Sequence, residues 1–133
     1  MPFIARSYDN NPAAPLDKGK WVDDGQGNEL GQCVSLVKFL IPELRGVSAT
    51  RSWKKGLPAF GNGAIQPGTA IATFNAAGHY FGHAAIFVSQ DDEGITVIDQ
   101  WVTPPAKAIG SRELKADPKH TGKNNAKSYY VVE

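Results

Sequence analysis

The sequence has few of the features that build disulfide frameworks, metal centres and membrane spans. Its only cysteine is Cys33, so no disulfide can form within the chain. The three histidines His79, His83 and His120 lack the paired spacing of a structural zinc site. No apolar run approaches bilayer length, and the N-terminus has no signal-peptide core. We therefore expect no metal, no membrane contact, and synthesis in the cytoplasm without a signal peptide.

Neither sign of charge is in clear excess. Fourteen Lys and Arg face thirteen Asp and Glu, which leaves a formal net charge of +1. The basic residues are scattered, with a mild concentration over 107–127, and no aromatic residues alternate with them as a base-stacking surface requires. Nucleic acid is thus not an expected partner. A length of 133 residues with 41% hydrophobic residues predicts one domain over 1–133 with a single core, and we expect a monomer.

One amphipathic helix stands out after a loop-rich N-terminal region over 1–30. Apolar residues recur at the i, i+3, i+4 and i+7 positions of a helical face, namely Cys33, Leu36, Val37 and Leu40. Gly31 precedes this run, and Pro42 ends it because the residue before a proline avoids helical geometry. The spacing predicts a helix from Gln32 to about Ile41.

The period changes to that of strands in the second half. Residues 43–66 form a connection broken by Gly and Pro, with room for a short helix over Ser48–Lys55 around Trp53. Runs typical of strands follow at Thr69–Phe74, Ala84–Val88, Ile95–Trp101, Lys107–Ile109 and Tyr129–Val132. Asp91–Gly94 predicts a hairpin turn, and 117–125 an exposed loop. The fold class is therefore α+β, with a helix packed on a mostly antiparallel sheet.

Cys33 and His83 are the candidate nucleophile and general base. A thiol attacks as thiolate, and a free thiol with a pKa of about 8.5 is mostly protonated at neutral pH. Cys33 opens the predicted helix, where unpaired N–H groups and the helix dipole favour negative charge. His83 opens a predicted strand after a Gly-rich loop, which would hold its imidazole more firmly than that of His79. Together they predict an activated cysteine.

The following strand offers two residues that could orient the imidazole, Asp99 and Gln100. Side chains alternate across a sheet, so only one of them shares a face with His83. If paired residue numbers sum to 182, His83 faces Asp99, whereas a slip of one residue brings Gln100 there instead. We favour Asp99, because a carboxylate stabilises a protonated imidazole more strongly than an amide does.

Three blocks in this order resemble a known group of enzymes. They are Gly31-Gln32-Cys33-Val34-Ser35-Leu36-Val37, Gly82-His83-Ala84-Ala85-Ile86-Phe87-Val88 and Ile95-Thr96-Val97-Ile98-Asp99-Gln100-Trp101. Their combination resembles the catalytic blocks of CHAP and NlpC-type peptidoglycan hydrolases. The resemblance implies a papain-like fold and cysteine hydrolysis of amide bonds, in the stem peptide or between glycan and peptide. The catalytic Cys, His and third polar residue fall on Cys33, His83 and Asp99. Many CHAP domains carry an Asn two residues after the acid, and here that position is Trp101.

Pro67–Phe74, with the histidine block and Asp99-Gln100-Trp101, more narrowly resembles a compact bacterial family associated with amidase effectors of type VI secretion. That resemblance implies an antibacterial protein delivered into the periplasm of a target cell and a cognate immunity protein as a partner. The mechanism it implies needs no organic cofactor. We expect the substrate cleft to be lined by Gln32, Trp53, Tyr80, Gln100 and Trp101.

Two other interpretations start from the same residues. A protein deamidase, thioesterase or acyltransferase would form the same acyl-enzyme on the same fold, so residues near Cys33 and His83 do not separate these activities. A non-catalytic wall-binding domain would keep the fold while Cys33 served as an ordinary core residue.

Overall fold

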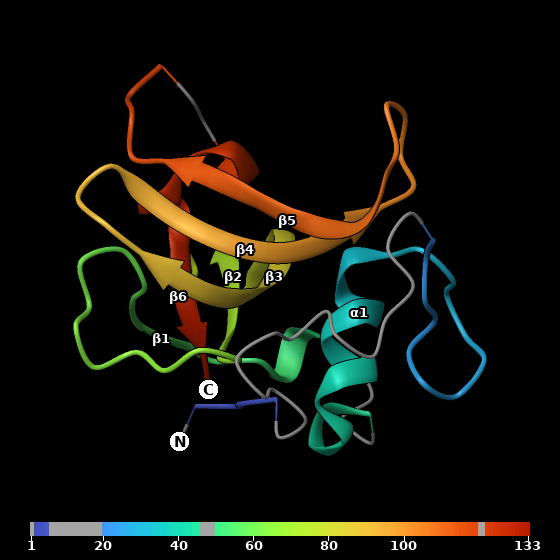
Figure 1. Cartoon of the computed structure of the whole chain (residues 1–133). Helices are drawn as coiled ribbons and strands as arrows, with labels where there is room; N and C mark the ends of the chain where they lie inside the picture. Colours follow the sequence, from blue (N-terminus) through green and yellow to red (C-terminus); the bar gives the residue numbers. More distant parts are fainter. Residues whose placement is uncertain (1, 6–19, 46–49, 120–121) are drawn as a thin grey trace.

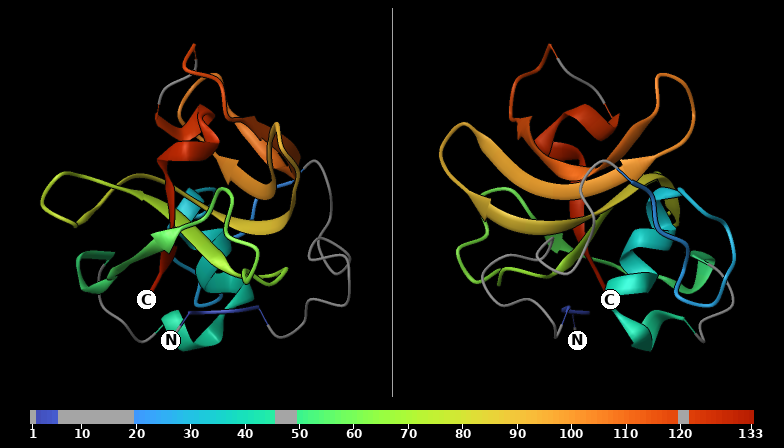
Figure 2. Two further views of the ribbon diagram at one scale, coloured as in Figure 1. Left: turned by 90° about the vertical axis from the view of Figure 1, so that its left-hand side faces the viewer. Right: turned by 45° about the vertical axis from the view of Figure 1, so that its right-hand side comes forward.

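The computed structural model describes residues 2–5, 20–45, 50–119 and 122–133. Its named strands form one antiparallel sheet in the order β1-β6-β2-β3-β4-β5, so β1 and β5 lie at the two edges. The strands are β1 (Lys55–Pro58), β2 (Ala70–Phe74), β3 (Tyr80–Gln90), β4 (Gly94–Trp101), β5 (Lys107–Lys115) and β6 (Tyr129–Val132). Figure 1 shows the helix α1 (Cys33–Leu40) beside the end of the sheet where β3 and β5 begin and β4 ends. Figure 2 shows the strong curvature of β4 and β5.

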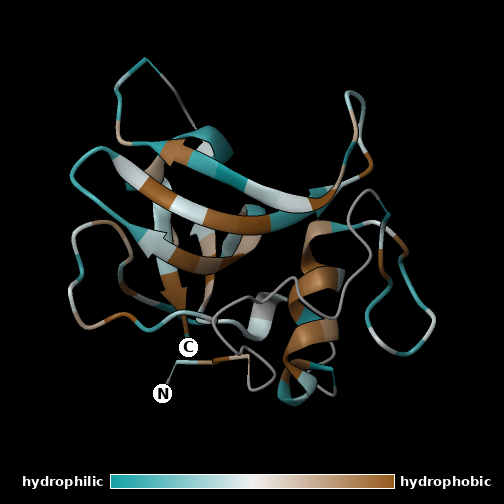
Figure 3. Ribbon diagram, in the orientation of Figure 1, coloured by the Kyte–Doolittle hydropathy of each residue, from teal (hydrophilic) through white to brown (hydrophobic). Residues whose placement is uncertain are grey.

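The predicted helix is present and nearly coincides with its expected bounds. Leu36, Val37 and Leu40 are buried on the side that packs against β3 and β4. At Pro42 the chain turns into a short 3₁₀ helix, Pro42–Leu44, as expected where proline removes a helical donor. Figure 3 shows how apolar and polar residues alternate along α1 and the strands. The helix is therefore held in place against the sheet, and its first residue, Cys33, lies near one end of the strands.

Both faces of the central strands are buried, and two cores form on opposite sides of the sheet, where the sequence predicted a single core. The core under α1 contains its apolar stripe together with Ala70, Ala72, Ala84, Ile86 and Ile98. The alternate residues Ile71, Ala85, Phe87, Val97 and Tyr129 belong to the second core. Each fully buried Ile, Val or Phe contributes roughly 1.5–3 kcal/mol. The central strands are thus held from both sides, and so are the side chains that they carry.

The predicted hairpin between β3 and β4 is confirmed, but the predicted register is wrong. Phe87 pairs with Val97 and Ile86 with Ile98, where Phe87 was expected to face Ile95. A bulge between Phe87 and Ser89 places an extra residue in β3. The net shift at the site is two residues, which leaves the side chains of the site on their predicted face. Asp99 therefore still shares a face with His83, as a diagonal neighbour rather than a direct partner.

Several other bounds also differ from the sequence prediction. Within the expected helix Ser48–Lys55, residues 48–49 lie outside the described residues, and a 3₁₀ turn covers Thr50–Ser52. It leads into β1, a strand that its Gly and Pro residues concealed. β3 begins at Tyr80, so His83 lies inside the strand rather than at its margin. β5 continues six residues beyond the predicted end at Ile109. Among the described residues, no helix is long and apolar enough to cross a membrane.

Candidate active site

Cys33 is the first residue of α1. Gln32 before it has an extended backbone, with φ −72° and ψ 148°, and no acidic side chain lies in the first turn. Gly31 has a φ of +87°, and a side chain there would also collide with Val102. The chain therefore turns sharply into the helix at a position that requires glycine. The thiol lies where first-turn N–H groups and the helix dipole favour an anion.

The His83 imidazole joins the thiol to Asp99. His83 Nε2 lies 3.0 Å from Asp99 Oδ2. The imidazole also lies close enough to Cys33 to lower the pKa of the thiol. The side chains of His83 and Asp99 are 3% and 0% exposed. Because Nε2 is engaged by the carboxylate, Nδ1 is the ring nitrogen left for the thiol. The structure thus brings together the three residues that the sequence predicted as catalytic, in the order thiol, imidazole, carboxylate.

Two cations of β5 hold the Asp99 carboxylate in place. Arg112 Nε donates to Oδ2 at 2.7 Å. Lys107 Nζ forms an ion pair with Oδ1 at 3.0 Å, while its hydrogen bonds go to backbone carbonyls, including that of Gly110. Burial raises the pKa of Asp99, but the hydrogen bond from His83 and the charges of Arg112 and Lys107 outweigh it and lower the pKa to about 2. Asp99 is therefore ionised at neutral pH, as an orienting carboxylate must be.

The pKa values of Cys33 and His83 move toward each other. Burial raises the pKa of the Cys33 thiol, but the hydrogen bond and charge of His83, the Tyr80 hydroxyl and the Ala84 N–H outweigh it, so the net shift is downward. Burial lowers the pKa of His83, but its hydrogen bonds to Asp99 and Cys33 prevail, so the net shift is upward. Both shifts favour a thiolate and imidazolium pair.

Tyr80 lies directly beside the thiol. Its hydroxyl is 3.4 Å from Cys33 Sγ, and its ring packs edge-on against Trp53 with centroids 5.3 Å apart. Burial, together with the neighbouring thiol, raises the pKa of Tyr80 far above its ordinary value. The phenol therefore stays neutral at every pH where Cys33 ionises, and it can donate a hydrogen bond to negative charge at this position.

A hollow of about 500 Å³ opens over the thiol. It is lined by Glu29, Gln32, Cys33, Val34, Lys38, Thr50, Tyr80 and Gly82. Two predicted cleft residues, Gln32 and Tyr80, line it. Trp53 does not, because it is 3% exposed and belongs to the core under α1. Trp101 packs edge-on against His83, with ring centroids 5.6 Å apart.

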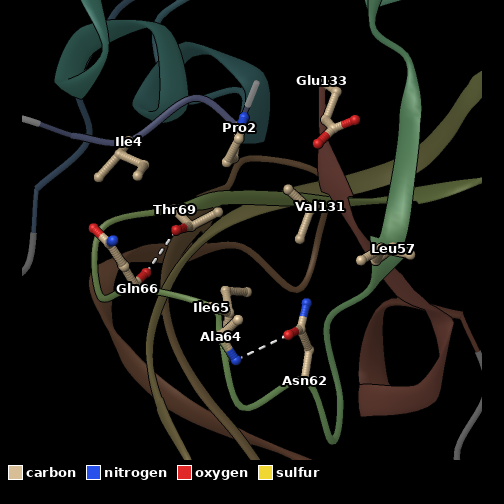
Figure 4. A pocket seen from close by; sticks show the side chains of 10 residues that line it. All are labelled: Pro2, Ile4, Leu57, Asn62, Ala64, Ile65, Gln66, Thr69, Val131 and Glu133. Carbon is tan, nitrogen blue, oxygen red and sulfur yellow. Dashed lines mark hydrogen bonds between the residues drawn. The ribbon is translucent and has the colours of Figure 1, made fainter.

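A separate apolar hollow of about 200 Å³ lies between the N-terminal segment and β1, with Ile4, Leu57 and Val131 on its walls (Figure 4). It contains none of the three catalytic candidates. Among the described residues, no group of three or more His, Cys, Asp or Glu side chains is placed to hold a metal ion.

The sequence profile of the family described as domesticated amidase effector 2 matches residues 5–132. The chain belongs to this family.

Individual members of the domesticated amidase effector 2 family are similar over most of the chain. A type VI secretion amidase effector 2 protein of Salmonella typhi is 36% identical over 118 residues, covering 77% of this chain and 84% of that protein. The domesticated amidase effector 2 of Ixodes scapularis is 39% identical over 120 residues, covering 87% of this chain and 78% of its own. The solved structure of type 6 secretion amidase effector 2 (Tae2) matches with a TM-score of 0.68 at 32% identity, over 86% of this chain and 87% of that one.

Membership of the domesticated amidase effector 2 family confirms the amidase class and the narrower of the two resemblances. The Tae2 structure confirms the mostly antiparallel sheet with its helix.

In this chain Gln100 has a structural role. The prediction that it lines the substrate cleft is therefore wrong. Its side chain is fully buried. Val22 N donates to its Oε1 at 2.9 Å, and its Nε2 donates to the carbonyls of Val22 and Gln32 at 2.9 and 2.8 Å. The amide thus fastens the segment before α1 to β4. Because Gln32 directly precedes Cys33, the buried amide of Gln100 holds the backbone next to the thiol.

Sequence reasoning missed two residues of the candidate site, Lys107 and Arg112. Both lie on β5, which pairs with β4, so Asp99 faces cations from a strand whose length was underestimated. A signal was available in the sequence. A buried carboxylate needs compensating charge, and the next strand along the chain carries Lys107 and Arg112 close to the register of Asp99.

Proposed function

We propose that this protein is a single-domain cysteine amidase of papain-like type, as in CHAP and NlpC enzymes, that hydrolyses amide bonds of peptidoglycan. The observation that carries the proposal is the chain of contacts from Cys33 through His83 to Asp99, which starts at a helix N-terminus. Shifts of pKa in opposite directions at Cys33 and His83 support it. The similarity to amidase effectors of type VI secretion supports amide bonds as the target.

The proposed reaction starts from the thiolate and imidazolium pair. The Cys33 thiolate attacks the carbonyl carbon, and the carbonyl electrons move onto its oxygen. N–H groups at the start of α1 receive this oxyanion, and the Tyr80 hydroxyl, 3.4 Å from Cys33 Sγ, can donate a hydrogen bond to it. His83 then protonates the leaving amine, and the C–N bond breaks.

Water completes the cycle by hydrolysing the thioester. His83 takes a proton from the attacking water, and the Cys33 thiolate leaves. Asp99 holds the ring orientation throughout and stabilises the imidazolium, without itself taking the proton. Every step uses residues of this chain and one water molecule.

The biological setting follows from the same proposal. As an effector of this family, the protein would act in the periplasm of a target cell, and a cognate immunity protein would cover the hollow over Cys33. We propose that the enzyme acts as a monomer, because one chain supplies all three catalytic side chains.

Digestion of purified cell wall tests the function. Peptidoglycan of the diaminopimelate type and of the lysine type is incubated with the protein, and soluble fragments are analysed by mass spectrometry. We expect fragments that each gain one water at an amide bond, with none released by the Cys33→Ala protein. Intact muropeptides beside a trapped acyl-enzyme would replace the proposal with a deamidase, thioesterase or acyltransferase. Wall binding without cleavage or thiol reactivity would indicate a non-catalytic domain.

A further inference from the structure

A second hollow adjoins the catalytic one at Gly82. It has a volume of about 380 Å³, and Gly82 lines both hollows. Its walls are Lys55, Thr73, Phe74, Asn75, Ala76, Phe81, Gly82, Gly122, Lys123, Ser128 and Tyr130. Gly82 has a φ of +110°, and a side chain there would lie 2.6 Å from Thr73 Oγ1. The position between the hollows therefore favours glycine. With no side chain at Gly82, an extended substrate can pass from one hollow to the other.

Two lysines give this second hollow a positive charge. Lys55 Nζ lies 4.1 Å from the centroid of the Tyr130 ring, and Lys123 Nζ lies 4.0 Å from that of Trp101. Within the described part of the chain, neither ammonium forms an ion pair with a carboxylate. Lys107 and Arg112 differ in this respect, because both form ion pairs with the Asp99 carboxylate. Among the described residues that line the second hollow there is no Asp or Glu.

The second hollow also lies close to the proposed catalytic residues. The Trp101 ring beneath Lys123 packs edge-on against the catalytic imidazole of His83. The backbone of Lys123 is fixed, since its carbonyl accepts hydrogen bonds from Arg112 Nη2 at 3.0 Å and from the Tyr129 hydroxyl at 2.8 Å. Its side chain can therefore be changed while the backbone contacts remain.

The lining of the hollow selects for a particular chemistry. Phe74, Phe81 and Tyr130 offer apolar surface, and Phe81 is 70% exposed. Apolar walls with two ammonium groups suit a peptide that has short aliphatic side chains and free carboxylates. Ammonium–carboxylate contacts at such a site are charge-assisted hydrogen bonds, which are stronger than neutral ones. A neutral peptide would leave both ammonium groups without a carboxylate partner.

We propose that this second hollow is a substrate subsite in which Lys55 and Lys123 bind a free carboxylate of the peptide whose amide bond Cys33 attacks. The inference rests on the proposed amidase function and adds the substrate class, a carboxylate-bearing peptide. Lys55 and Lys123 are specificity residues that act through substrate affinity, so their effect falls on KM rather than on kcat.

The test uses two wall-derived stem peptides that differ only in whether their carboxylates are free or converted to carboxamides. The wild-type enzyme is expected to cleave the free form with a kcat/KM about tenfold higher. Lys55→Gln and Lys123→Gln should each raise KM for the free form about fivefold with kcat nearly unchanged, and the double variant should lose the preference. Lys127→Gln removes the same charge from an exposed position and should behave as wild type.

Equal cleavage of the two peptides by the wild-type enzyme, or a preference that survives in the double variant, would overturn the subsite while leaving the amidase function in place. Titration calorimetry of both peptides on the Cys33→Ala protein repeats the comparison without turnover. Tighter binding of the free form that depends on Lys55 and Lys123 supports the subsite, and equal binding rejects it. Failure of the amidase function itself appears separately, as wild-type protein that releases no more wall fragments than Cys33→Ala.

Discussion

Replacing Cys33 by alanine is expected to abolish amide hydrolysis, and His83→Ala should lower it by at least about 10³-fold. The first change removes the sulfur that forms the acyl-enzyme. The second removes the hydrogen bond and charge that lower the thiol pKa, and also the acid that protonates the leaving amine. The measurement is the release of peptide fragments from purified wall, with circular dichroism to verify that each variant is folded.

His79→Ala is the matched control for the histidine. His79 is exposed in the turn before β3, and its backbone N–H donates to Asn75 Oδ1. Because its side chain lies outside both hollows, its loss should leave hydrolysis at the wild-type rate. Activity lost in His79→Ala but kept in His83→Ala would reverse the assignment of the base.

Asp99→Asn is expected to reduce both activity and stability. Asparagine keeps the shape but cannot stabilise an imidazolium, and it permits the wrong tautomer of His83, so kcat should fall by roughly 10²–10⁴-fold. It also leaves Arg112 and Lys107 without their buried counter-ion. Their side chains are 18% and 23% exposed, so water relieves part of the penalty. We expect a loss of about 2–4 kcal/mol in the free energy of unfolding.

The pH dependence of stability provides an independent check on Asp99. Its pKa is about 2 in the folded protein, against about 3.9 for an unfolded Asp. A depressed folded pKa stabilises the protein above about pH 4, and this contribution, roughly 2 kcal/mol, is lost as the pH falls from about 4 to 2. Urea unfolding at several pH values should show that loss in the wild type and not in Asp99→Asn.

Lys115→Gln serves as the control for charge removal on β5. Lys115 pairs with Glu113 and Glu93 at the surface, where screening makes an ion pair weak. Its unfolding midpoint should match that of the wild type. If Asp99→Asn were as stable and as active as Lys115→Gln, the carboxylate would have neither of the roles assigned to it.

The helix and the shared face of His83 and Asp99 could be predicted from sequence because they depend on periodicity. An apolar stripe can be recognised on a helix without knowing any strand register. On a strand, an error of two residues leaves each side chain on the same face, and near the site the error between β3 and β4 was two residues. The exact register could not be predicted. A bulge lies between Phe87 and Ser89, and the local sequence gives no sign of it.

Predictions that depended on tertiary burial were less successful. Trp53 and Gln100 were expected in the cleft from their residue type, whereas the structure buries one in the core and the other among backbone groups of the segment before α1. Their burial depends on segments distant in sequence. The cations around Asp99 were missed for a similar reason, since Arg112 reaches it only through strand pairing.

The central claim is that His83 takes the proton of Cys33, so that the two form a thiolate and imidazolium pair. The rate of Cys33 alkylation by iodoacetamide as a function of pH tests this claim most directly. With the thiol pKa lowered by His83, wild-type protein should react rapidly at mildly acidic pH, well below the ordinary thiol pKa of about 8.5, and His83→Ala should lose that reactivity. The same alkylation profile in both proteins, rising only near or above the ordinary thiol pKa, would contradict the account.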